Sequence, residues 1–400
     1  MAETRDEPKA KTLSIAMLRH EPIQDARVCL TPSDVAKLTQ AGHTIRVPAA
    51  PSSDPAFSAD AYSNAGALVT ASDDELLEAT ILVTLHPPAP ETAGKLTPNH
   101  TLLGFLSPFE RAEAIAELAD RGTTAVALEL VPRTTIAQSM DALSSQASLA
   151  GYAAVMLAAA RLPKAFPMMS TAAGTIRPAK VLVLGAGVAG LQAIATAQRL
   201  GARVTGFDVR SAAAEQVRSL GAKFAPVPNA EAEDAETAGG YAKEASDDQL
   251  ARQREHLKAL AATSDIVITT AQVFAKAAPT LMTLDMIDAM QPGSVIIDAA
   301  AATGGNVERT EGDSAEERTR NGVTIIADPI LPARVAHDAS QVLSANIVAL
   351  LDRITNPQTA TIKQAGEDDI ADAVTVTRSG SITDGRIAAR TGTRNEGASS

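Results

Sequence analysis

The chain has 400 residues and a formal net charge of −12, with six histidines, one cysteine and no tryptophan. This length exceeds what one compact core usually holds, so two domains are expected. The acidic balance, without a cluster of Lys and Arg, argues against a nucleic-acid partner. The scattered histidines lack the paired spacing of a metal site.

The lone Cys29 lies in an apolar run and is expected to be an unreactive core thiol in a reducing compartment. The longest apolar stretch, 149–162, is too short and too rich in alanine to predict a membrane span. Residues 1–11 are charged and lack the apolar core of a signal peptide.

From residue 12 to residue 130, short apolar segments alternate with helical ones. Buried strands are predicted at 13–17, 44–47, 81–85, 102–105 and 125–128. Helix starts are marked by Thr31-Pro32, a cap followed by proline, and by Ser72 with Glu75 three residues later, a capping box. This alternation predicts a mostly parallel sheet with helices on both faces.

A long helix over 139–162, ended by Pro163, leads into a second region of the same kind. Its strands are predicted at 181–185, 203–207, 266–268, 295–297 and 323–326. A last long helix, 334–352, returns the chain to the first region. A small hairpin is expected over 374–382, around Ser379-Gly380.

We therefore expect an α/β fold with two Rossmann-like doubly wound domains, mostly parallel sheets and long connecting helices. One domain is discontinuous, 1–143 plus 332–390, and the other, 144–331, is inserted into it. The acidic segment 228–248 has no apolar face and is expected to be a mobile loop. The polar tail 391–400 is expected to be disordered.

The strongest motif is Gly185-Ala186-Gly187-Val188-Ala189-Gly190, between a short strand and a helix. Its first glycine allows a tight turn, the second lets a pyrophosphate approach the backbone, and the third lets the helix pack close to the strand. Asp208 ends the next strand, roughly 20 residues on, where an acid hydrogen-bonds the adenosine ribose. These features predict a dinucleotide site that favours NAD(H), although the nearby Arg210 weakens that preference. A tight turn without a ligand is the alternative.

Several segments outside this motif have a distinctive sequence. They are Pro132-Arg133, Ala137-Gln138-Ser139-Met140-Asp141-Ala142-Leu143-Ser144-Ser145-Gln146, 166–169, 171–174, Asp208-Val209-Arg210 and Glu236-Thr237-Ala238-Gly239-Gly240-Tyr241. Together they resemble the NAD(H)-binding component of proton-translocating NAD(P) transhydrogenase, a relative of alanine dehydrogenase. Because the chain ends without membrane helices, it resembles the soluble α1 form of that α subunit.

The resemblance implies roles for individual residues. Arg133, Gln138 and Asp141 match the catalytic loop, which holds the nicotinamide end of the cofactor and faces an NADP(H)-binding partner. Ser144 matches a residue near the nicotinamide carboxamide, and Tyr241 matches the tyrosine of a mobile loop that closes over the nucleotide. The other implied cofactor-binding residues are Gly185, Gly187, Val188, Ala189, Gly190, Asp208, Val209, Arg210, Thr270 and Ala271.

The resemblance also implies an activity and an assembly. Hydride passes directly from NADH to NADP⁺ on a partner subunit, as in the Re/Si-specific enzyme, and separate membrane-embedded subunits translocate protons. The chain would form a homodimer in the cytoplasm and attach to the inner membrane through those subunits. Because a hydride carries no proton, such a site needs orienting groups and exclusion of water but no general base.

Simpler interpretations remain for three of these residues. Asp141 is also placed to complement a helix dipole, Arg133 to be a solvated surface residue, and Tyr241 to be incidental to its loop.

The chain departs from the family near the cofactor cleft. Leu18-Arg19 replaces a Lys-Glu pair, Ala275 replaces a glycine, Ala302 replaces a glutamate, and Ile330 precedes Leu331-Pro332 where Asn-Val-Pro is common. These departures leave open a divergent, non-catalytic NAD(H)-binding module.

A second alternative is an alanine-dehydrogenase-like enzyme acting on a 2-oxo acid. It requires a group that binds a carboxylate and a lysine or histidine that handles a proton. Arg27 is a candidate for the first role and His86 for the second, although His86 is more typical of a half-exposed residue at a strand end. Ser107 stands where that branch has a histidine and cannot act as a base.

Overall fold

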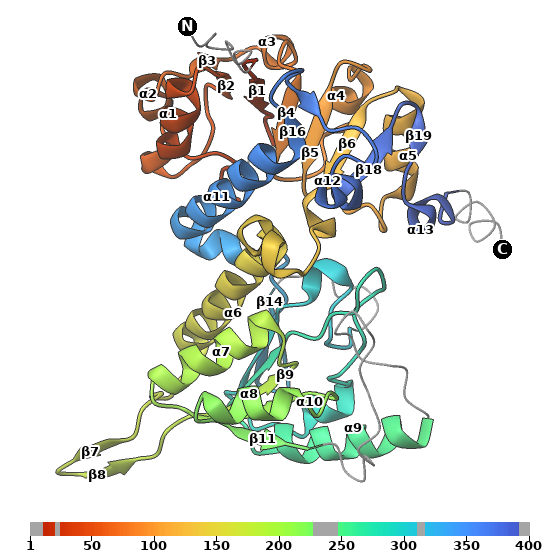
Figure 1. The fold of residues 1–400 in the computed structure, drawn as a ribbon. Coiled ribbons are helices and arrows are strands. Elements are labelled where there is room, and N and C mark those ends of the chain that lie inside the picture. The colour runs from red at the N-terminus through yellow and green to blue at the C-terminus, as the bar shows by residue number, and fades with distance from the viewer. Residues whose placement is uncertain (1–10, 21–24, 227–246, 310–316, 392–400) are drawn as a thin grey trace, which may run out of the picture. The chain divides into compact units, whose positions relative to one another are not determined.

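The computed structural model describes residues 11–20, 25–226, 247–309 and 317–391 (Figure 1). By its internal contacts the chain divides into two compact units. The first unit comprises Met1–Gln146 and Ala336–Ser400, and the second comprises Ala147–Val335. Each unit contains one large, mostly parallel sheet with helices between its strands, so the predicted fold class is confirmed.

The sheet of the first unit has the order β3-β2-β1-β4-β5-β6-β18-β19 within the described ranges. Its first six strands pair in parallel, whereas β18 pairs antiparallel with both β6 and β19. The strands are β1 (Ser14–Met17), β2 (Thr44–Pro48), β3 (Leu68–Thr70), β4 (Ile81–Thr84), β5 (Thr101–Gly104), β6 (Thr124–Ala127), β18 (Thr375–Arg378) and β19 (Ser381–Ile382). The helices are α1 (Pro32–Gln40), α2 (Ala59–Asn64), α3 (Asp73–Leu76), α4 (Pro90–Gly94), α5 (Ala112–Asp120), α11 (Ala336–Ile354), α12 (Asp369–Val374) and α13 (Gly385–Ala388).

Local signals in the sequence placed several elements of this unit correctly. The Thr31 hydroxyl caps α1 by accepting from the Asp34 N–H, and the Ser72 hydroxyl caps α3 by accepting from the Glu75 N–H at 3.3 Å. The predicted hairpin is present as β18 and β19. Its turn residues Ser379 and Gly380 have φ values of 49° and 83°, which a two-residue type I′ turn requires.

The sheet of the second unit has the order β11-β10-β9-β12-β13-β15-β14 among the described residues, and β14 alone pairs antiparallel. The strands are β9 (Lys180–Leu184), β10 (Arg203–Phe207), β11 (Lys223–Ala225), β12 (Ile266–Thr269), β13 (Val295–Asp298), β14 (Glu317–Arg320) and β15 (Val323–Ile326). The helices are α7 (Val188–Arg199), α8 (Ala213–Ser219), α9 (Asp247–Ala262) and α10 (Leu284–Asp288), and the chain enters this unit within α6 (Ala142–Arg161).

Both faces of this second sheet are buried, which explains its continuous apolar strands. Val181 and Val183 pack with alanines of α6 and α7, whereas Leu182 and Leu184 pack with α9 and α10 on the other face. The alternation follows from the period of two along a strand. The backbones of α6 and α7 are in close contact, because a side chain on Gly151 would overlap the Ala189 carbonyl.

Three expectations need correction. The helix predicted over 139–162 begins only at Ala142, because residues Thr135–Met140 form the 3-10 helix η3. The last long helix begins at Ala336 rather than 334, after the 3-10 helix η5 (Leu331–Val335). The edge strands β3, β11 and β14 and the hairpin of β7 (Met169–Thr171) and β8 (Gly174–Ile176) were not predicted, since short, exposed strands lack a strong apolar pattern.

Helix α6 is the one described helix that is long and apolar enough to cross a membrane by length and composition. The stretch 149–162 is predicted from the sequence to be too short for a membrane span. The whole helix α6, with 20 residues, is long enough, so length does not exclude a span. Within its apolar window 39% is buried, and Ala153, Ala154, Val155 and Ala158 pack in the core of the second unit. Such packing is typical of a core helix.

The structure tests the prediction made for Cys29 but not the predictions made for two flexible segments. Cys29 is buried and free, so the prediction of a core thiol is confirmed, and burial raises the pKa of the thiol to about 12, which disfavours the reactive thiolate. The segments 228–248 and 391–400 lie almost wholly outside the described residues.

Candidate functional site

The turn between β9 and α7 has the geometry of a phosphate-binding loop. Gly185 has a φ of 99°, in the left-handed region that glycine adopts without strain. A side chain on Gly190 would overlap the Gly185 carbonyl oxygen, so only glycine lets α7 start this close to β9. A side chain on Gly187, in contrast, would meet no atom within 4 Å. The protein's own packing does not require glycine there, and the open space fits a pyrophosphate at the N-terminus of α7.

Asp208, at the end of β10, is tied to this turn. Its Oδ2 accepts from the Ala186 N–H at 2.7 Å and from the Arg210 guanidinium at 2.9 Å, and its Oδ1 accepts from Nε and the backbone N–H of Arg210. Burial opposes ionisation, but these hydrogen bonds outweigh it and lower the pKa of Asp208. The carboxylate therefore also holds the phosphate turn in place. Its pairing with Arg210 weakens the repulsion of a 2′-phosphate that Asp208 alone would exert.

Thr270 and Ala271 follow β12 and contact the same turn through a buried network. The Thr270 hydroxyl donates to the Gly185 carbonyl at 3.1 Å. The side-chain amide of Asn306 accepts from the Ala271 N–H and donates to the Ala271 carbonyl, at 3.0 and 2.8 Å. Asn306 in turn donates its backbone N–H to the buried Asp298 carboxylate. Asn306 was not among the residues singled out from the sequence.

The remaining cofactor candidates of the second unit differ in exposure. Val188 is exposed and Ala189 half-buried in the first turn of α7, and Val209 is half-buried next to Asp208. Tyr241 lies outside the described residues.

In the first unit, the residues assigned to the nicotinamide end line one hollow. Arg133, Gln138, Asp141 and Ser144 border an open depression of about 460 Å³ with Pro132, Thr134, Ser145 and Asn346. The structure therefore brings together the four polar side chains that the resemblance singled out in this segment. Ser145 and Asn346 were missed, and Asn346 could not be found by spacing because it lies about 200 residues away on α11.

Asp141 caps helix α6 as well as facing this hollow. Its Oδ1 accepts from the Ser144 N–H at 2.8 Å, and its Oδ2 accepts from the Ser144 hydroxyl at 2.6 Å. This is the hydrogen bonding of a helix N-cap, so the simpler interpretation of Asp141 describes some of its role. Capping also explains why the helix begins at Ala142.

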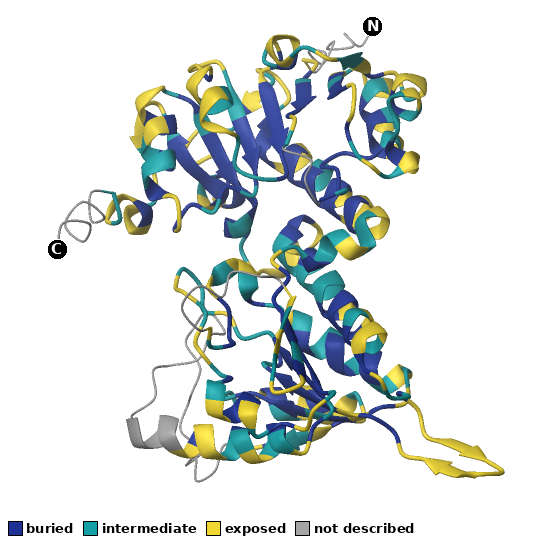
Figure 2. Ribbon diagram, turned by 180° about the vertical axis from the view of Figure 1, so that it is seen from behind, coloured by how far each residue is buried: buried dark blue, intermediate teal, exposed yellow. Residues whose placement is uncertain are grey.

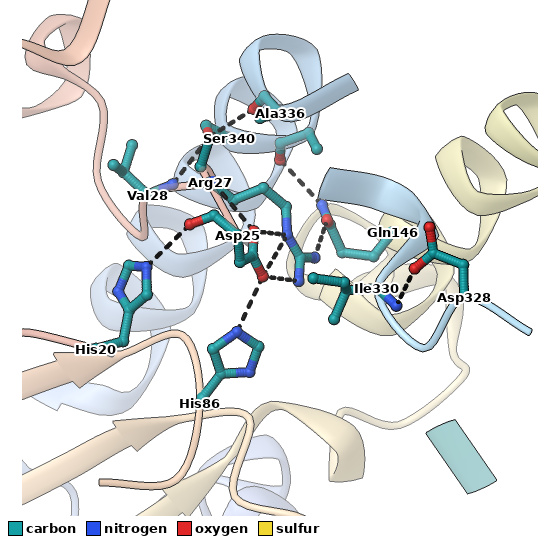
Figure 3. Close-up of polar contacts among 12 residues, drawn as sticks. His20, Asp25, Arg27, Val28, His86, Gln146, Asp328, Ile330, Ala336 and Ser340 are labelled. Atoms are coloured by element: carbon teal, nitrogen blue, oxygen red, sulfur yellow. Dashed lines mark hydrogen bonds and ion pairs between the residues drawn. The ribbon is translucent and has the colours of Figure 1, made fainter. Parts of the chain in front are cut away.

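Beside β1 and β4, a buried charged cluster forms around Asp25 (Figure 3). Its carboxylate accepts from the Arg27 guanidinium at 2.7 Å and is 2.9 Å from the His86 Nε2, while Arg27 Nη1 donates to Gln146. Burial opposes ionisation of Asp25, but hydrogen bonds from His86 and Arg27 outweigh it and hold its pKa well below the usual range. Arg27 is 6% exposed and each of its guanidinium nitrogens is engaged, so it offers little to a substrate carboxylate. This weakens the amino-acid dehydrogenase alternative.

A second acid, Glu129, is half-buried and lies against Ser107. Its Oε1 accepts from the Ser107 N–H at 2.7 Å, and its Oε2 is buried without a hydrogen-bond partner among the described residues. Ser107 has a φ of 49°, so this contact holds a residue in the left-handed region. Burial raises the pKa of Glu129 to about 7, against the opposing hydrogen bond from Ser107.

Replacing Glu129 with glutamine is expected to raise the free energy of unfolding at pH 8 by about 1–3 kcal/mol and to change it little at pH 5. The folded chain keeps this proton up to a pH of about 7, whereas the unfolded chain releases it near 4.5. The stability of the natural chain therefore falls as the pH rises between these values. Urea unfolding at both pH values measures the difference, and an equal change at pH 5 and pH 8 contradicts the assignment.

Of two departures from the family near the end of the second sheet, one strains the backbone and the other is exposed. Ala275, which stands in place of a glycine, has a φ of 59°, a conformation that strains a residue with a Cβ by about 1 kcal/mol. Ala302 is exposed in the short 3-10 helix Ala301–Thr303. The network from Asp298 to Asn306 is intact despite both changes.

Comparison with known proteins gives matches over most of the chain. The family models "Alanine dehydrogenase/PNT, N-terminal domain" and "Alanine dehydrogenase/PNT, C-terminal domain" match residues 17–150 and 154–385. NAD(P) transhydrogenase subunit alpha of Cereibacter sphaeroides is 42% identical over 360 residues, which are 90% of this chain and 69% of that protein. The first part of NAD(P) transhydrogenase subunit alpha of Rhodospirillum rubrum is 40% identical over 376 residues. These residues are 92% of this chain and 97% of that protein.

Solved structures show the same relationship. The crystal structure of transhydrogenase from Sinorhizobium meliloti aligns with a TM-score of 0.77 and 36% identity over 92% of this chain and 98% of that one. An L-alanine dehydrogenase aligns with a TM-score of 0.73 at 22% identity, over 93% of this chain and 98% of that one, and so shares the fold.

Proposed function

The chain belongs to the alanine dehydrogenase/PNT family, and we propose that it is the NAD(H)-binding, α1-type subunit of a proton-translocating NAD(P) transhydrogenase. Its relatives named as transhydrogenase alpha subunits support an oxidoreductase subunit with a nucleotide-binding, Rossmann-like fold. The observation that carries the proposal is the hollow bordered by Arg133, Gln138, Asp141 and Ser144. It gathers orienting amide, hydroxyl and charged groups from a segment that resembles the NAD(H)-binding component of transhydrogenase.

The reaction proposed is direct hydride transfer with Re/Si specificity. Bound NADH supplies the hydride, with both electrons of the broken C–H bond, and NADP⁺ on a partner subunit accepts it. The turn around Gly187 binds the pyrophosphate, and Asp208 binds the adenosine ribose in competition with Arg210. Arg133 and Gln138 orient the nicotinamide end. The Ser144 hydroxyl donates a hydrogen bond to the Asp141 carboxylate, so both groups are engaged in holding the start of α6. An arrangement of this kind fits a reaction in which no side chain has to transfer a proton.

We propose the domain division, the partners and the location on the same basis. The NAD(H)-binding domain spans 144–331, and the discontinuous domain spans 1–143 and 332–390. The partners are membrane-embedded subunits with an NADP(H)-binding domain, which perform the proton translocation. The chain is then cytoplasmic and attached to the inner membrane only through them.

We also propose a homodimer, supported by exposed apolar side chains of the second unit. The hairpin of β7 and β8 is exposed along its whole length (Figure 2), and an isolated two-stranded hairpin is marginally stable in water. It carries the exposed Met168, Met169 and Ile176. A second copy of the chain would cover these side chains, and sedimentation equilibrium of the purified chain measures its mass directly.

Replacing Asp141 with asparagine is expected to reduce hydride transfer from NADH to NADP⁺ on the partner by about 10-fold or more, with NADH affinity changed by less than about threefold. Asparagine can still accept from the Ser144 N–H, so the start of α6 is preserved. Stopped-flow transfer rates and fluorescence titration of NADH measure the two quantities. Asp120→Asn, which removes an exposed carboxylate from the end of α5, is the matched control.

Three other results would contradict the proposal. Equal losses of rate and affinity in Asp141→Asn would assign this residue to binding or folding alone. Oxidation of NADH by pyruvate and ammonia without a partner would favour the amino-acid dehydrogenase alternative. Tight NADH binding without transfer to any acceptor, with an intact partner present, would favour a non-catalytic module.

A further inference from the structure

Gln138 lies on the six-residue 3-10 helix η3 (Thr135–Met140). A 3-10 helix has poorer hydrogen-bond geometry than an α-helix and is seldom longer than one turn. At its ends the Ala137 N–H donates to Thr134 at 3.0 Å, and the Asp141 N–H donates to Gln138 at 3.4 Å. Contacts outside η3 are therefore expected to contribute to its orientation.

Apolar packing supplies some of that contact. Ala137 and Met140, on one side of η3, are buried in the core of the first unit with Leu343 and Ile347 of α11. Hydrophobic contact is non-directional, so it fixes the depth of η3 better than its rotation. Gln138 and Ser139, on the other side, are exposed.

The directional contact comes from Asn346 of α11. Its Nδ2 donates to the Ser139 carbonyl at 2.7 Å, and its Oδ1 accepts from the Ser145 hydroxyl at 2.7 Å. Asn346 is 8% exposed, so water competes little for these bonds. One amide thus links η3 to the first turn of α6, on either side of the cap residue Asp141.

We propose that Asn346 is a positioning residue for hydride transfer, which fixes the Ser139–Met140 peptide of η3 and so the direction of the neighbouring Gln138 side chain. The inference rests on the proposed function of the hollow that Gln138 borders. A misplacement of about 1 Å in a reacting geometry costs up to about 100-fold in rate. NADH affinity depends mainly on the phosphate turn and changes little.

The test is Asn346→Asp, which keeps the size of the side chain but places an acceptor against the Ser139 carbonyl. In the full chain with its NADP(H)-binding partner, the transfer rate is expected to fall about 10- to 100-fold, with the NADH dissociation constant within about threefold. Ala345→Asp, at the neighbouring exposed position of the same helix, adds the same charge and is the matched control. An equal loss in the control, or an equal loss of affinity, overturns the proposal.

A double-mutant cycle separates positioning from general stability. If Asn346 acts through Gln138, then Asn346→Asp causes almost no further loss of rate in a Gln138→Ala chain, whereas independent effects multiply. Multiplying effects therefore overturn the proposal.

Hydrogen exchange of the amides of 135–141, measured on the chain alone, needs no activity. Asn346→Asp is expected to accelerate it there and not in the sheet. If the natural chain transfers no hydride, the proposed function fails, and unchanged exchange would show separately that Asn346 does not hold η3.

Discussion

Replacing Gly187 with alanine is expected to weaken NADH binding by about 10- to 100-fold while leaving the chain folded. The added methyl group meets no protein atom within 4 Å, and the φ of −80° and ψ of −166° are open to any residue. It would occupy only the space into which the pyrophosphate fits. Fluorescence titration of NADH and urea unfolding measure the two quantities.

The same substitution at Gly190 is the matched comparison. Its methyl group would overlap the Gly185 carbonyl and lie 3.0 Å from the Thr270 hydroxyl, so α7 would have to move away from β9. We expect a loss of about 3 kcal/mol or more in the free energy of unfolding. Gly187→Ser places a residue that is favoured at a helix N-cap before α7, so the helix start is preserved. This variant should bind NADH as poorly as the alanine variant. Normal NADH affinity in both Gly187 variants would show that no phosphate lies over this turn.

Replacing Arg27 with methionine is expected to lower the free energy of unfolding by about 3–5 kcal/mol at pH 7. The change leaves the buried Asp25 carboxylate with His86 as its remaining side-chain hydrogen-bond partner among the described residues, and it also deprives Gln146 of its donor. Because Arg27 and His86 lower the pKa of Asp25, the natural pairing stabilises the fold above a pH of about 4 and loses its contribution as the pH falls further. The destabilisation should therefore be smaller at pH 3 than at pH 7.

The double variant Asp25→Asn with Arg27→Met controls for lost packing. Removing both charges leaves no unpaired buried ion, so more than half of the lost stability should return. Urea unfolding at pH 7 and pH 3 measures each variant. A loss in Arg27→Met of less than about 1 kcal/mol, or no recovery in the double variant, would show that the cluster is not a buried ion pair in solution.

Local sequence patterns predicted the central strands of both sheets and the phosphate turn. A strand such as β9 is buried on both faces, so its apolar run is continuous and visible without any knowledge of its neighbours. Caps at Thr31 and Ser72 and the turn at Ser379-Gly380 are equally local, because their partners lie within a few residues. Edge strands such as β3 were not predicted from the sequence. Its three residues are exposed or half-exposed, so they show no apolar alternation that could be detected.

The candidate site was predictable only where it depends on consecutive residues. The segment that contains Gln138, Asp141 and Ser144 was identified by its similarity to a family, but its conformation was not. The helix expected from residue 139 begins at Ala142, because Asp141 caps it, and the preceding η3 packs in the same core as α11. The fully buried contacts of Arg27 likewise reversed the expectation that its guanidinium was available for a substrate.

The sequence by itself determined the α/β class, the glycine spacing of the turn and the relationship to a known family, because each is written in residues that are neighbours along the chain. Only the tertiary structure decided that Asn346 joins Ser139 to Ser145, that Asn306 pairs with Ala271, and that Asp208 is shared between Arg210 and the turn. A hydrogen bond requires two groups within about 3 Å at a suitable angle. For residues separated by tens to hundreds of positions, only the folded chain sets that distance.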